Sequence, residues 1–353
     1  MLSGLLDAGG GDKSDGSLFY VPLSDKKAEI PVDINSKNNI AGVFLIMSKI
    51  IVFGGTGWVG HYIVLDLAAH GHEVVVASRG QREENYAVNP VGVRRIVVDK
   101  SSEEQMQKLF EEKFDIVIDT VPTPESIALV FKYAGKLRHY LHCSSTGGYT
   151  PLPFIPCDET ARFHGEAGKG WSNKAVCDAE VMRLFNVYGF PATVIRPCYI
   201  TGGGDKLPID NLGGRREEFI PEVLEEKVLE VADNGLALLQ PIHVEDLARS
   251  FRLAIENRAS IGERYNICLD HALAVKDYLA LTAEALGKRC NLEFVPLEEL
   301  LVRHPENPRG LNFFAKHMCF SIEKARREIG YVPEHSVEET IVETARLCAK
   351  RFV

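Results

Sequence analysis

The sequence lacks the cysteine spacings that mark a disulfide framework or a zinc site. Its eight cysteines are scattered along 353 residues, without a C-x-x-C pair, an H-E-x-x-H segment or a clustered Cys/His spacing. Those spacings are typical of small secreted scaffolds and of structural zinc sites. We therefore expect reduced thiols in a cytoplasmic protein and no metal site.

Long apolar runs and an excess of positive charge are also missing. The longest apolar run near the N-terminus, 40–47, is too short to span a bilayer and lacks the flanks of a signal peptide. The formal net charge of -9 gives no long-range attraction for phosphate backbones or anionic lipids. Neither membrane insertion nor nucleic-acid binding is therefore expected. The arginine pairs 94–95, 215–216 and 326–327 are isolated, and we expect them to be solvated surface.

Residues 1–47 show no sustained hydrophobic period and are rich in Gly, Asp, Ser and Lys. This composition predicts a disordered or loosely attached extension. A second interpretation is that Met47 is the physiological start, because the folded pattern begins immediately after it. Mass spectrometry of natively expressed protein decides between the two, since finding residues 1–46 on most of the protein rules out the later start.

From Ile50 onward, short apolar runs alternate with helical patterns, which predicts βαβ units and a parallel sheet. The expected fold class is α/β: a Rossmann-type, doubly wound sheet of about six or seven strands over 48–200, completed by segments within about 236–268. We expect 201–353 to form mainly a smaller, interleaved substrate-binding lobe over the crevice of the sheet. The predicted strands are 50–53, 74–76, 95–98, 115–118, 140–143 and 193–195, and the predicted helices are one led by Val59, Ile63 and Leu67, then 104–110, 126–133 and 173–188.

A glycine-rich loop, Gly54-Gly55-Thr56-Gly57-Trp58-Val59-Gly60, separates the first predicted strand from the first predicted helix. In this context such glycines hold the pyrophosphate of a dinucleotide at the helix N-terminus, whereas elsewhere they indicate only a surface turn. Gly54 permits the tight turn, Gly57 lets the backbone approach the pyrophosphate, and Gly60 allows the helix to pack closely on the strand. We therefore predict a bound nicotinamide dinucleotide.

The residues after the second predicted strand decide between NAD and NADP. An NAD site places an acidic residue about twenty positions beyond the glycines, where it bonds the ribose hydroxyls. This chain has Ser78 and Arg79 there, with Arg82 close behind. A hydroxyl and a guanidinium suit a 2′-phosphate, so NADP is predicted over NAD, although an exposed loop arginine is the alternative for Arg79. Asp99, after the third strand, fits either a contact with the adenine edge or the start of a loop.

The sequence resembles the extended short-chain dehydrogenase/reductase superfamily, the nucleotide-sugar epimerase and dehydratase group, over roughly residues 49–345. The resemblance implies a Ser or Thr after the fifth strand and a Tyr-x-x-x-Lys pair on the next helix, in which the lysine holds the ribose and lowers the tyrosine pKa. The matching segments are Phe53–Gly60, Phe114–Thr120, Cys143–Ser145 with Tyr149, Arg196–Pro197, Pro241–Ala248, Tyr265–Ile267 and Ser321–Pro333.

By this resemblance Ser145 takes the serine position, Lys174 the lysine position, and Pro197 belongs to the cofactor site. Ser145 either orients a substrate oxygen or caps the strand end, and Lys174 either binds the nicotinamide ribose or is a surface lysine. The chain departs from the family pattern at Gly170, which stands where the tyrosine belongs. Glycine offers no proton-transfer group, so another residue supplies it or the family reaction is not run. The candidates are Tyr149, Tyr199 and His164, each weighed against a packing or surface role.

A second departure concerns the substrate. Family members that act on sugar nucleotides carry an arginine four residues before the position of His243, where this chain has Leu239. Arg309 or the pair 215–216 are possible substitutes, against the simpler interpretation of surface arginines. We expect His243 and Asp246 to have structural roles in joining the two lobes.

The pattern also resembles an atypical subgroup that keeps the glycine loop and loses the catalytic tyrosine, and that includes isoflavone-reductase-like enzymes and chloroplast stem-loop RNA-binding proteins. Two hypotheses follow. The first is an NAD(P)-dependent epimerase/dehydratase-type oxidoreductase acting on a hydroxyl or carbonyl of a sugar-like or nucleotide-sugar metabolite. The second is a redox-silent NADP-binding protein whose partner is a protein or RNA. A homodimer is expected from the resemblance.

Overall fold

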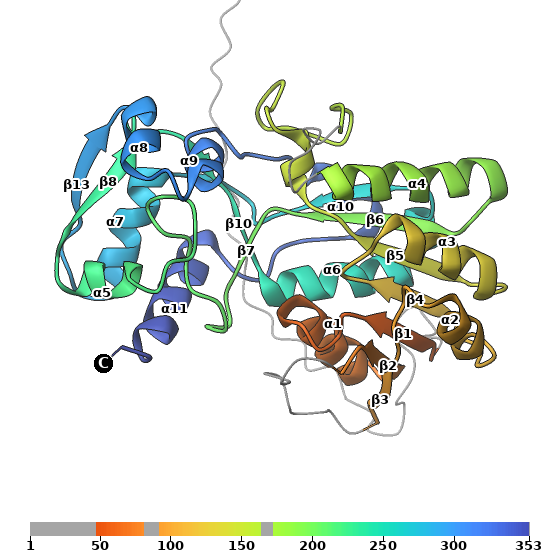
Figure 1. The fold of residues 1–353 in the computed structure, drawn as a ribbon. Helices are drawn as coiled ribbons and strands as arrows, with labels where there is room; N and C mark the ends of the chain where they lie inside the picture. Colours follow the sequence, from red (N-terminus) through yellow and green to blue (C-terminus); the bar gives the residue numbers. More distant parts are fainter. Residues whose placement is uncertain (1–46, 81–91, 164–171, 353) are drawn as a thin grey trace, which may run out of the picture. The chain divides into compact units, whose positions relative to one another are not determined.

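A seven-stranded parallel sheet is the centre of the computed structural model, which describes residues 47–80, 92–163 and 172–352 (Figure 1). The strand order β11-β6-β5-β4-β1-β2-β3 confirms the predicted fold class. The predicted extension, apart from Met47, lies outside the described residues. The strands of this sheet are β1 (Lys49–Phe53), β2 (Glu73–Ser78), β3 (Arg94–Val97), β4 (Ile116–Asp119), β5 (His139–Cys143), β6 (Ala192–Pro197) and β11 (Arg264–Ile267).

The strand order reverses between β1 and β4, and this reversal positions the site. Strands β2 and β3 follow on one side of β1, whereas β4, β5 and β6 follow on the other. Phe53, at the end of β1, is in register with Ala77 of β2 and Asp119 of β4. Open parallel sheets bind ligands beyond the carboxyl ends of their strands at such a reversal. The loops after Phe53 and Asp119 are therefore the expected walls of a ligand site.

Both faces of the sheet are buried, which explains why its strands appear in the sequence as continuous apolar runs. Ile50 and Val52 of β1 belong to one core cluster, while Ile51 and Phe53 belong to the other. Helices α1 and α6 pack together over the first face, and α2, α3 and α4 are neighbours over the second (Figure 1). The bounds of these helices are α1 (Trp58–Ala69), α2 (Glu103–Leu109), α3 (Pro124–Tyr133), α4 (Ser172–Tyr188) and α6 (Val244–Glu256).

After β6 the chain alternates between a second group of elements, which contains β8 and β13, and the central sheet with its covering helices, to which β11 and α6 belong. Strand β8 pairs with β13 in this group, whereas α6 packs on α1 and β11 pairs with β6. Among the described helices, none combines the length and the apolar character needed to cross a bilayer. The remaining elements are β7 (Tyr199–Thr201), α5 (Phe219–Leu224), β8 (Val228–Ala232), β9 (Leu238–Leu239), β10 (Pro241–His243), β12 (Leu273–Ala274), α7 (Val275–Ala285), β13 (Asn291–Val295), α8 (Leu297–Arg303), α9 (Pro308–Phe314), α10 (Glu323–Ile329) and α11 (Val337–Ala349).

A buried ion-pair network fastens α4 to the sheet. Asp178 of α4 accepts hydrogen bonds from His142 Nε2 of β5 at 2.8 Å and from Arg196 Nε of β6 at 2.9 Å. Arg196 is 1% exposed and also donates to the hydroxyl of Tyr149 at 2.6 Å. Burial opposes ionisation of Asp178, but the hydrogen bond from His142 and the charge of Arg196 outweigh it and lower the pKa of Asp178. The network fixes α4, and with it Lys174 one turn earlier on this helix.

A second polar cluster joins α6 to the segment before α11. The carboxylate of Asp246, 1% exposed, accepts the backbone N–H groups of Glu334 and His335 at 2.8 and 3.1 Å. It also bonds Nδ1 of His335 at 2.9 Å, and the hydrogen bond raises the pKa of His335. Burial and the neighbouring charge of His335 lower the pKa of His243, whose ring stacks on that of His335 at 3.6 Å. Asp246 and His243 thus have the structural roles that we expected.

Replacing His335 with glutamine should cost stability in a pH-dependent way. Because the folded-state pKa of His335 is raised, its contribution is fully present below the unfolded value near 6.5 and is lost as the pH rises through the folded value. We expect His335→Gln to lower the free energy of unfolding by about 1 kcal/mol at about pH 5.5, and by less at about pH 8.5. Urea unfolding at both pH values measures the difference. An equal cost at both would show that the charge of His335 does not matter.

Candidate active site

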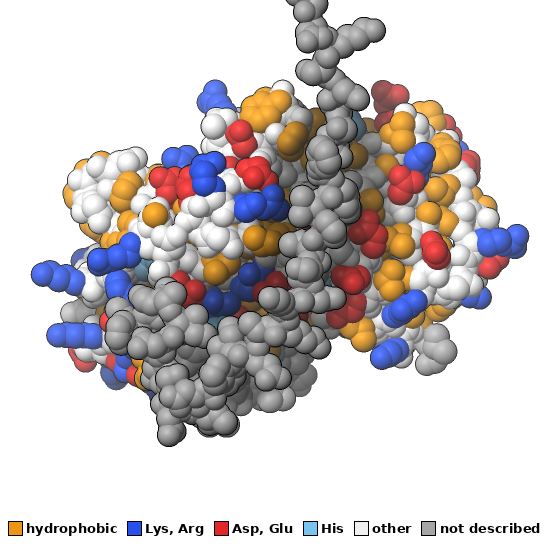
Figure 2. All heavy atoms as spheres, turned by 180° about the vertical axis from the view of Figure 1, so that it is seen from behind, with side chains coloured by type: hydrophobic (Ala, Val, Ile, Leu, Met, Phe, Trp, Pro, Cys, Tyr) orange, Lys and Arg blue, Asp and Glu red, His pale blue; other side chains and the backbone are white. Residues whose placement is uncertain are grey.

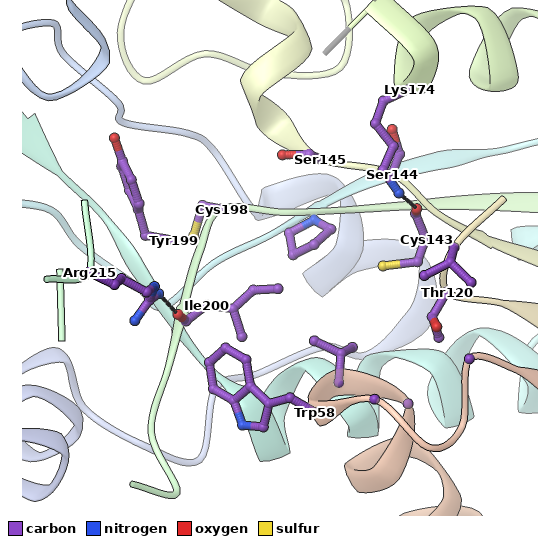
Figure 3. A pocket seen from close by; sticks show the side chains of 16 residues that line it. Trp58, Thr120, Cys143, Ser144, Ser145, Lys174, Cys198, Tyr199, Ile200 and Arg215 are labelled. Atoms are coloured by element: carbon purple, nitrogen blue, oxygen red, sulfur yellow. Dashed lines mark hydrogen bonds between the residues drawn. The ribbon is translucent and has the colours of Figure 1, made fainter. Parts of the chain in front are cut away.

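A cavity of about 470 Å³ lies at the carboxyl ends of the central strands, beside the reversal of strand order (Figure 3). Its wall combines the glycine loop with the ends of β4, β5 and β6, the start of α4, and the loop before α5. Many of the lining side chains are apolar, and the polar ones gather in a few places, which is the usual composition of a small-molecule site. The lining residues are Gly54, Gly57, Trp58, Val59, Gly60, Thr120, Val121, Cys143, Ser144, Ser145, Lys174, Pro197, Cys198, Tyr199, Ile200 and Arg215.

The glycine loop has the backbone geometry that a dinucleotide requires. Gly54 has a φ of 80°, in the left-handed region, and its carbonyl accepts the N–H of Gly57 at 2.9 Å. Gly57 is the N-cap of α1 and offers no side-chain oxygen to the first N–H groups of the helix. Those N–H groups and the helix dipole are thus left for an anion such as a pyrophosphate. Gly55 packs beneath the loop against Val76 and does not line the cavity.

Replacing Gly60 with alanine should destabilise the protein, although glycine-to-alanine changes in helices normally stabilise by up to about 1 kcal/mol. A Cβ on Gly60 would lie 2.2 Å from the carbonyl oxygen of Gly54, which is backbone and cannot rotate away. We expect a loss of about 1 to 3 kcal/mol in the free energy of unfolding, together with weaker dinucleotide binding. Gly57→Ala is the matched control for the stability measurement alone, because its Cβ would lie 3.3 Å from the same oxygen and should cost less free energy of unfolding. A stabilised Gly60→Ala chain would contradict this packing role.

Lys174 and Ser145 face the same cavity from α4 and from the end of β5. Nζ of Lys174 donates one hydrogen bond to the carbonyl of Cys143 at 2.7 Å (Figure 3), which leaves two further N–H donors. The side chain is half-buried and is therefore not a plain surface lysine. The hydroxyl of Ser145 accepts the N–H of Gly147 at 3.2 Å and so caps the turn after β5, while its own O–H stays available as a donor. Pro197 lines the same cavity.

Only one of the three candidates for the missing proton-transfer group lines the cavity within the described chain. Tyr149 is fully buried and its hydroxyl lies between Arg196 and Asn266, so it has a packing role. Tyr199 lines the cavity, and burial raises the pKa of its hydroxyl, which keeps it protonated. His164 lies outside the described residues, as does Gly170 itself.

Ser78 and Arg79, expected to read the 2′-phosphate, and Asp99, expected at the adenine, are not among the residues that line the cavity. Ser78 is half-buried and Arg79 is exposed. The carboxylate of Asp99 accepts hydrogen bonds from the N–H and the hydroxyl of Ser101, which lower its pKa, and Arg79 lowers it further. Asp99 therefore starts a loop, and its contact with adenine stays a prediction. Arg82 lies outside the described residues, and Thr56 is in the loop but not in the cavity wall.

The prediction that residues 215 and 216 are solvated surface arginines was wrong. Arg215 lines the cavity, where its guanidinium lies 5.8 Å from the centre of the Trp58 ring. Arg216 forms ion pairs with Asp210 and Glu222. The error arose because burial of these residues depends on how the loop from 202 to 218 folds against the cavity, which leaves no periodic signal in the sequence.

Sequence reasoning also missed an ion pair at the strand ends. Nζ of Lys100, which follows β3, bonds both carboxylate oxygens of Asp119 at 2.8 Å. Asp119 ends β4 and is fully buried, so its charge needs a partner at that position. The pair holds the end of β4, from which Thr120 and Val121 enter the cavity wall. The sequence signal for this pair was Asp119 itself, a carboxylate at the end of the apolar run of β4.

Among the described residues, His243, Glu245 and His335 offer three ligand atoms within 4.8 Å of one another. The two imidazole rings are stacked with an interplanar angle of 12°. Imidazole lone pairs lie in the ring plane, so stacked rings confine them to two separate, nearly parallel planes and do not aim both at one ion. In addition, Nδ1 of His243 accepts the N–H of Glu245, and Nε2 faces Glu343 at 2.8 Å. The cluster is thus better suited to joining structural segments than to holding a metal.

Comparison with known sequences finds a consistent group of relatives. The sequence model of the NAD dependent epimerase/dehydratase family matches residues 50–128 and 125–268. The chain is 25% identical over 317 residues to the chloroplast stem-loop binding protein of 41 kDa b from Arabidopsis thaliana, covering 85% of this chain and 79% of the relative. It is 26% identical over 334 residues to the UDP-glucose 4-epimerase of Corynebacterium glutamicum, covering 84% of this chain and 94% of that enzyme.

Solved structures share the fold at lower sequence identity. An epimerase from Methanothermobacter thermautotrophicus superposes with a TM-score of 0.69 at 20% identity, covering 87% of this chain and 94% of that one. A UDP-glucose 4-epimerase from Stenotrophomonas maltophila, solved with bound NAD, also has a TM-score of 0.69, at 18% identity, covering 86% and 99%.

Proposed function

Because the chain belongs to the NAD dependent epimerase/dehydratase family, we propose that it is an NADP-dependent oxidoreductase acting on a hydroxyl or carbonyl group of a sugar-like metabolite. One observation carries this proposal. The glycine loop, Lys174, Ser145 and Tyr199 line the same cavity, so groups suited to hold a dinucleotide and hydroxyl groups suited to bind the oxygens of a substrate share one space. NAD is the alternative cofactor.

The residues present fit a nicotinamide dinucleotide. The uncapped N-terminus of α1 offers N–H groups to the pyrophosphate, and Gly57 leaves that approach open. When bound, the nicotinamide would supply or accept a hydride. The two free N–H donors of Lys174 would hold the ribose hydroxyls. Ser145 would donate a hydrogen bond to the reacting oxygen of the substrate, whereas the protonated Tyr199, on the Arg215 side of the cavity (Figure 3), would donate one to another oxygen of the substrate.

Cofactor turnover tests the proposal. The purified chain is loaded with NADPH, pools of carbonyl-containing sugars and sugar nucleotides are added, and the fluorescence of the reduced cofactor is followed. We expect one pool to oxidise the cofactor, and Lys174→Ala to weaken cofactor binding roughly tenfold to a hundredfold, the effect of lost hydrogen bonds to a charged donor. Lys227→Ala is the control, because Lys227 is exposed and pairs with Glu225 at the surface. No oxidation with any pool would contradict the oxidoreductase proposal.

The second candidate is a redox-silent NADP-binding protein with a macromolecular partner. It draws on the stem-loop binding relative in Arabidopsis thaliana and on the glycine at position 170. The charge distribution favours the first candidate, since the net charge is -9 and acidic and basic side chains are interspersed on the described face in Figure 2. An RNA-binding surface needs a basic stripe or patch. Cofactor binding without turnover, together with salt-sensitive RNA binding, would favour the second candidate.

Replacing Arg79 with alanine should discriminate between the two dinucleotides. An exposed guanidinium after β2 can form a charge-assisted hydrogen bond to a 2′-phosphate, which NAD lacks. We expect Arg79→Ala to weaken NADP binding by about 1.5 to 3 kcal/mol and to leave NAD nearly unchanged, measured by calorimetric titration. Arg289→Ala, an exposed arginine paired with Glu226, should change neither affinity. Equal losses for both dinucleotides would show that Arg79 does not read the 2′-phosphate.

A further inference from the structure

Arg215 is a half-buried cation in the cavity wall, and within the described chain it forms no ion pair. Its guanidinium donates hydrogen bonds from Nη1 to the carbonyl of Leu207 and from Nη2 to the carbonyl of Ile200. These carbonyls fix the orientation of the side chain but carry no net charge, and three of its five N–H donors remain. Burial lowers the pKa of Arg215 below its ordinary value, as expected for a charge that its surroundings do not balance.

Asp210, the carboxylate whose charge acts on the pKa of Arg215, is committed elsewhere. Asp210 faces Nε of Arg216 at 3.4 Å and accepts three backbone N–H groups of its own loop. Arg216 gains a second carboxylate, Glu222, at 3.0 Å, and its pKa is raised although burial opposes this. The two consecutive arginines thus differ in how their charges are balanced. Arg216 is balanced by acids of the protein, whereas Arg215 is not.

The position of Arg215 in the cavity indicates which ligand could balance its charge. In Figure 3, Arg215 and Tyr199 lie at one side of the cavity, opposite Lys174 and Thr120. The N-terminus of α1 and Lys174 are the groups proposed to hold the cofactor, so Arg215 is at the end left for substrate. Trp58, between the loop and Arg215, presents an aromatic ring to the guanidinium at 5.8 Å.

We propose that Arg215 binds a compact oxyanion of the substrate, a carboxylate or a phosphate group. The inference rests on the proposed function and names its substrate class: a metabolite with a reactive carbonyl or hydroxyl at the Ser145 side and an anionic group at the Arg215 side. An oxyanion would accept hydrogen bonds from the unused N–H groups of Arg215 and would balance the charge of its guanidinium. The hydrogen bonds to the two carbonyls already hold the guanidinium in one orientation for this contact. The body of the substrate would lie against Trp58, Pro197 and Ile200.

Calorimetric titration of the NADP-saturated chain with inorganic phosphate and, separately, with malonate tests this site. We expect saturable binding of one or both anions. The anion that binds more tightly indicates whether the substrate carries a phosphate or a carboxylate. Arg215→Gln should weaken that binding about tenfold or more, the loss of one charge-assisted hydrogen bond, while NADP affinity is unchanged. Arg289→Gln, exposed and distant in the sequence, should leave both affinities unchanged.

Two results would overturn the anion site: binding of neither anion by the wild-type complex, or equal binding by the wild-type and Arg215→Gln chains. If circular dichroism shows that Arg215→Gln does not fold, the anion titrations of the wild-type and Arg215→Lys chains test the site instead. Lysine keeps the charge and should retain part of the anion affinity. NADP affinity is measured first in every chain. If the wild-type chain does not bind NADP, the proposed function is contradicted. The same anion titrations on the cofactor-free chain then test the anion site at Arg215 by themselves.

Discussion

Replacing Asp178 with asparagine should lower the free energy of unfolding by about 3 to 5 kcal/mol, the cost of leaving a buried charge without its partner. Asparagine keeps the shape of aspartate but leaves the guanidinium of Arg196, 1% exposed, without a carboxylate. Because the pKa of Asp178 is lowered in the folded state, its contribution is present above the unfolded value and is lost as the pH falls through the folded value. Urea unfolding at neutral pH measures the effect.

Glu180→Gln is the matched control for Asp178→Asn. Glu180 is on the same helix and pairs with Arg183, but that pair is at the surface, with Arg183 50% exposed. Such pairs contribute about 0.5 kcal/mol. Similar losses for Asp178→Asn and Glu180→Gln would show that the buried network does not anchor α4.

Replacing Tyr199 with phenylalanine should lower turnover at subsaturating substrate about tenfold, the effect of one hydrogen bond lost between the hydroxyl and the substrate. The change removes only the hydroxyl, because the ring keeps its edge contacts with Phe313 and Phe314 at 6.1 and 6.4 Å. NADP affinity should not change. Single-turnover oxidation of bound NADPH by the active substrate pool measures the rate.

Tyr133→Phe is the control for Tyr199→Phe, since Tyr133 bonds Glu103 on an exposed helix surface of α3. Equal rates for wild-type and Tyr199→Phe would show that the hydroxyl of Tyr199 does not contact the substrate. For the proton donor, His164 remains a candidate from the sequence, and it lies outside the described residues.

The sheet could be predicted from the sequence because its signals are local. Each central strand is buried on both faces, so Ile50–Phe53 and Ile116–Asp119 appear as apolar runs, and glycines at fixed spacing follow the first of them. The resemblance to the epimerase/dehydratase group was confirmed by the family match over 50–268. The edge strand β11 was expected only as a later segment, because its pairing with β6 is a long-range contact.

The site could be predicted only in part, since most of its remaining features depend on contacts between distant segments. Lys174 and Ser145 reach one cavity because Asp178 ties α4 to β5 and β6. Tyr149 is 47 residues from Arg196 in sequence, and only the fold shows that its hydroxyl is bound there. Arg215 looked like surface because its burial comes from the returning loop and from Trp58.

The central claim is that the cavity beside the glycine loop holds a nicotinamide dinucleotide, and Trp58 offers a direct reporter. The chain has two tryptophans, so in a Trp171→Phe variant only Trp58, in the cavity wall, remains. In Trp171→Phe, titration with NADPH should produce energy transfer from Trp58 to the reduced nicotinamide that saturates at one cofactor per chain. The transfer should be absent when Trp58→Phe is added to Trp171→Phe, because that chain has no tryptophan. A folded Trp171→Phe chain that shows no saturable transfer would contradict the account.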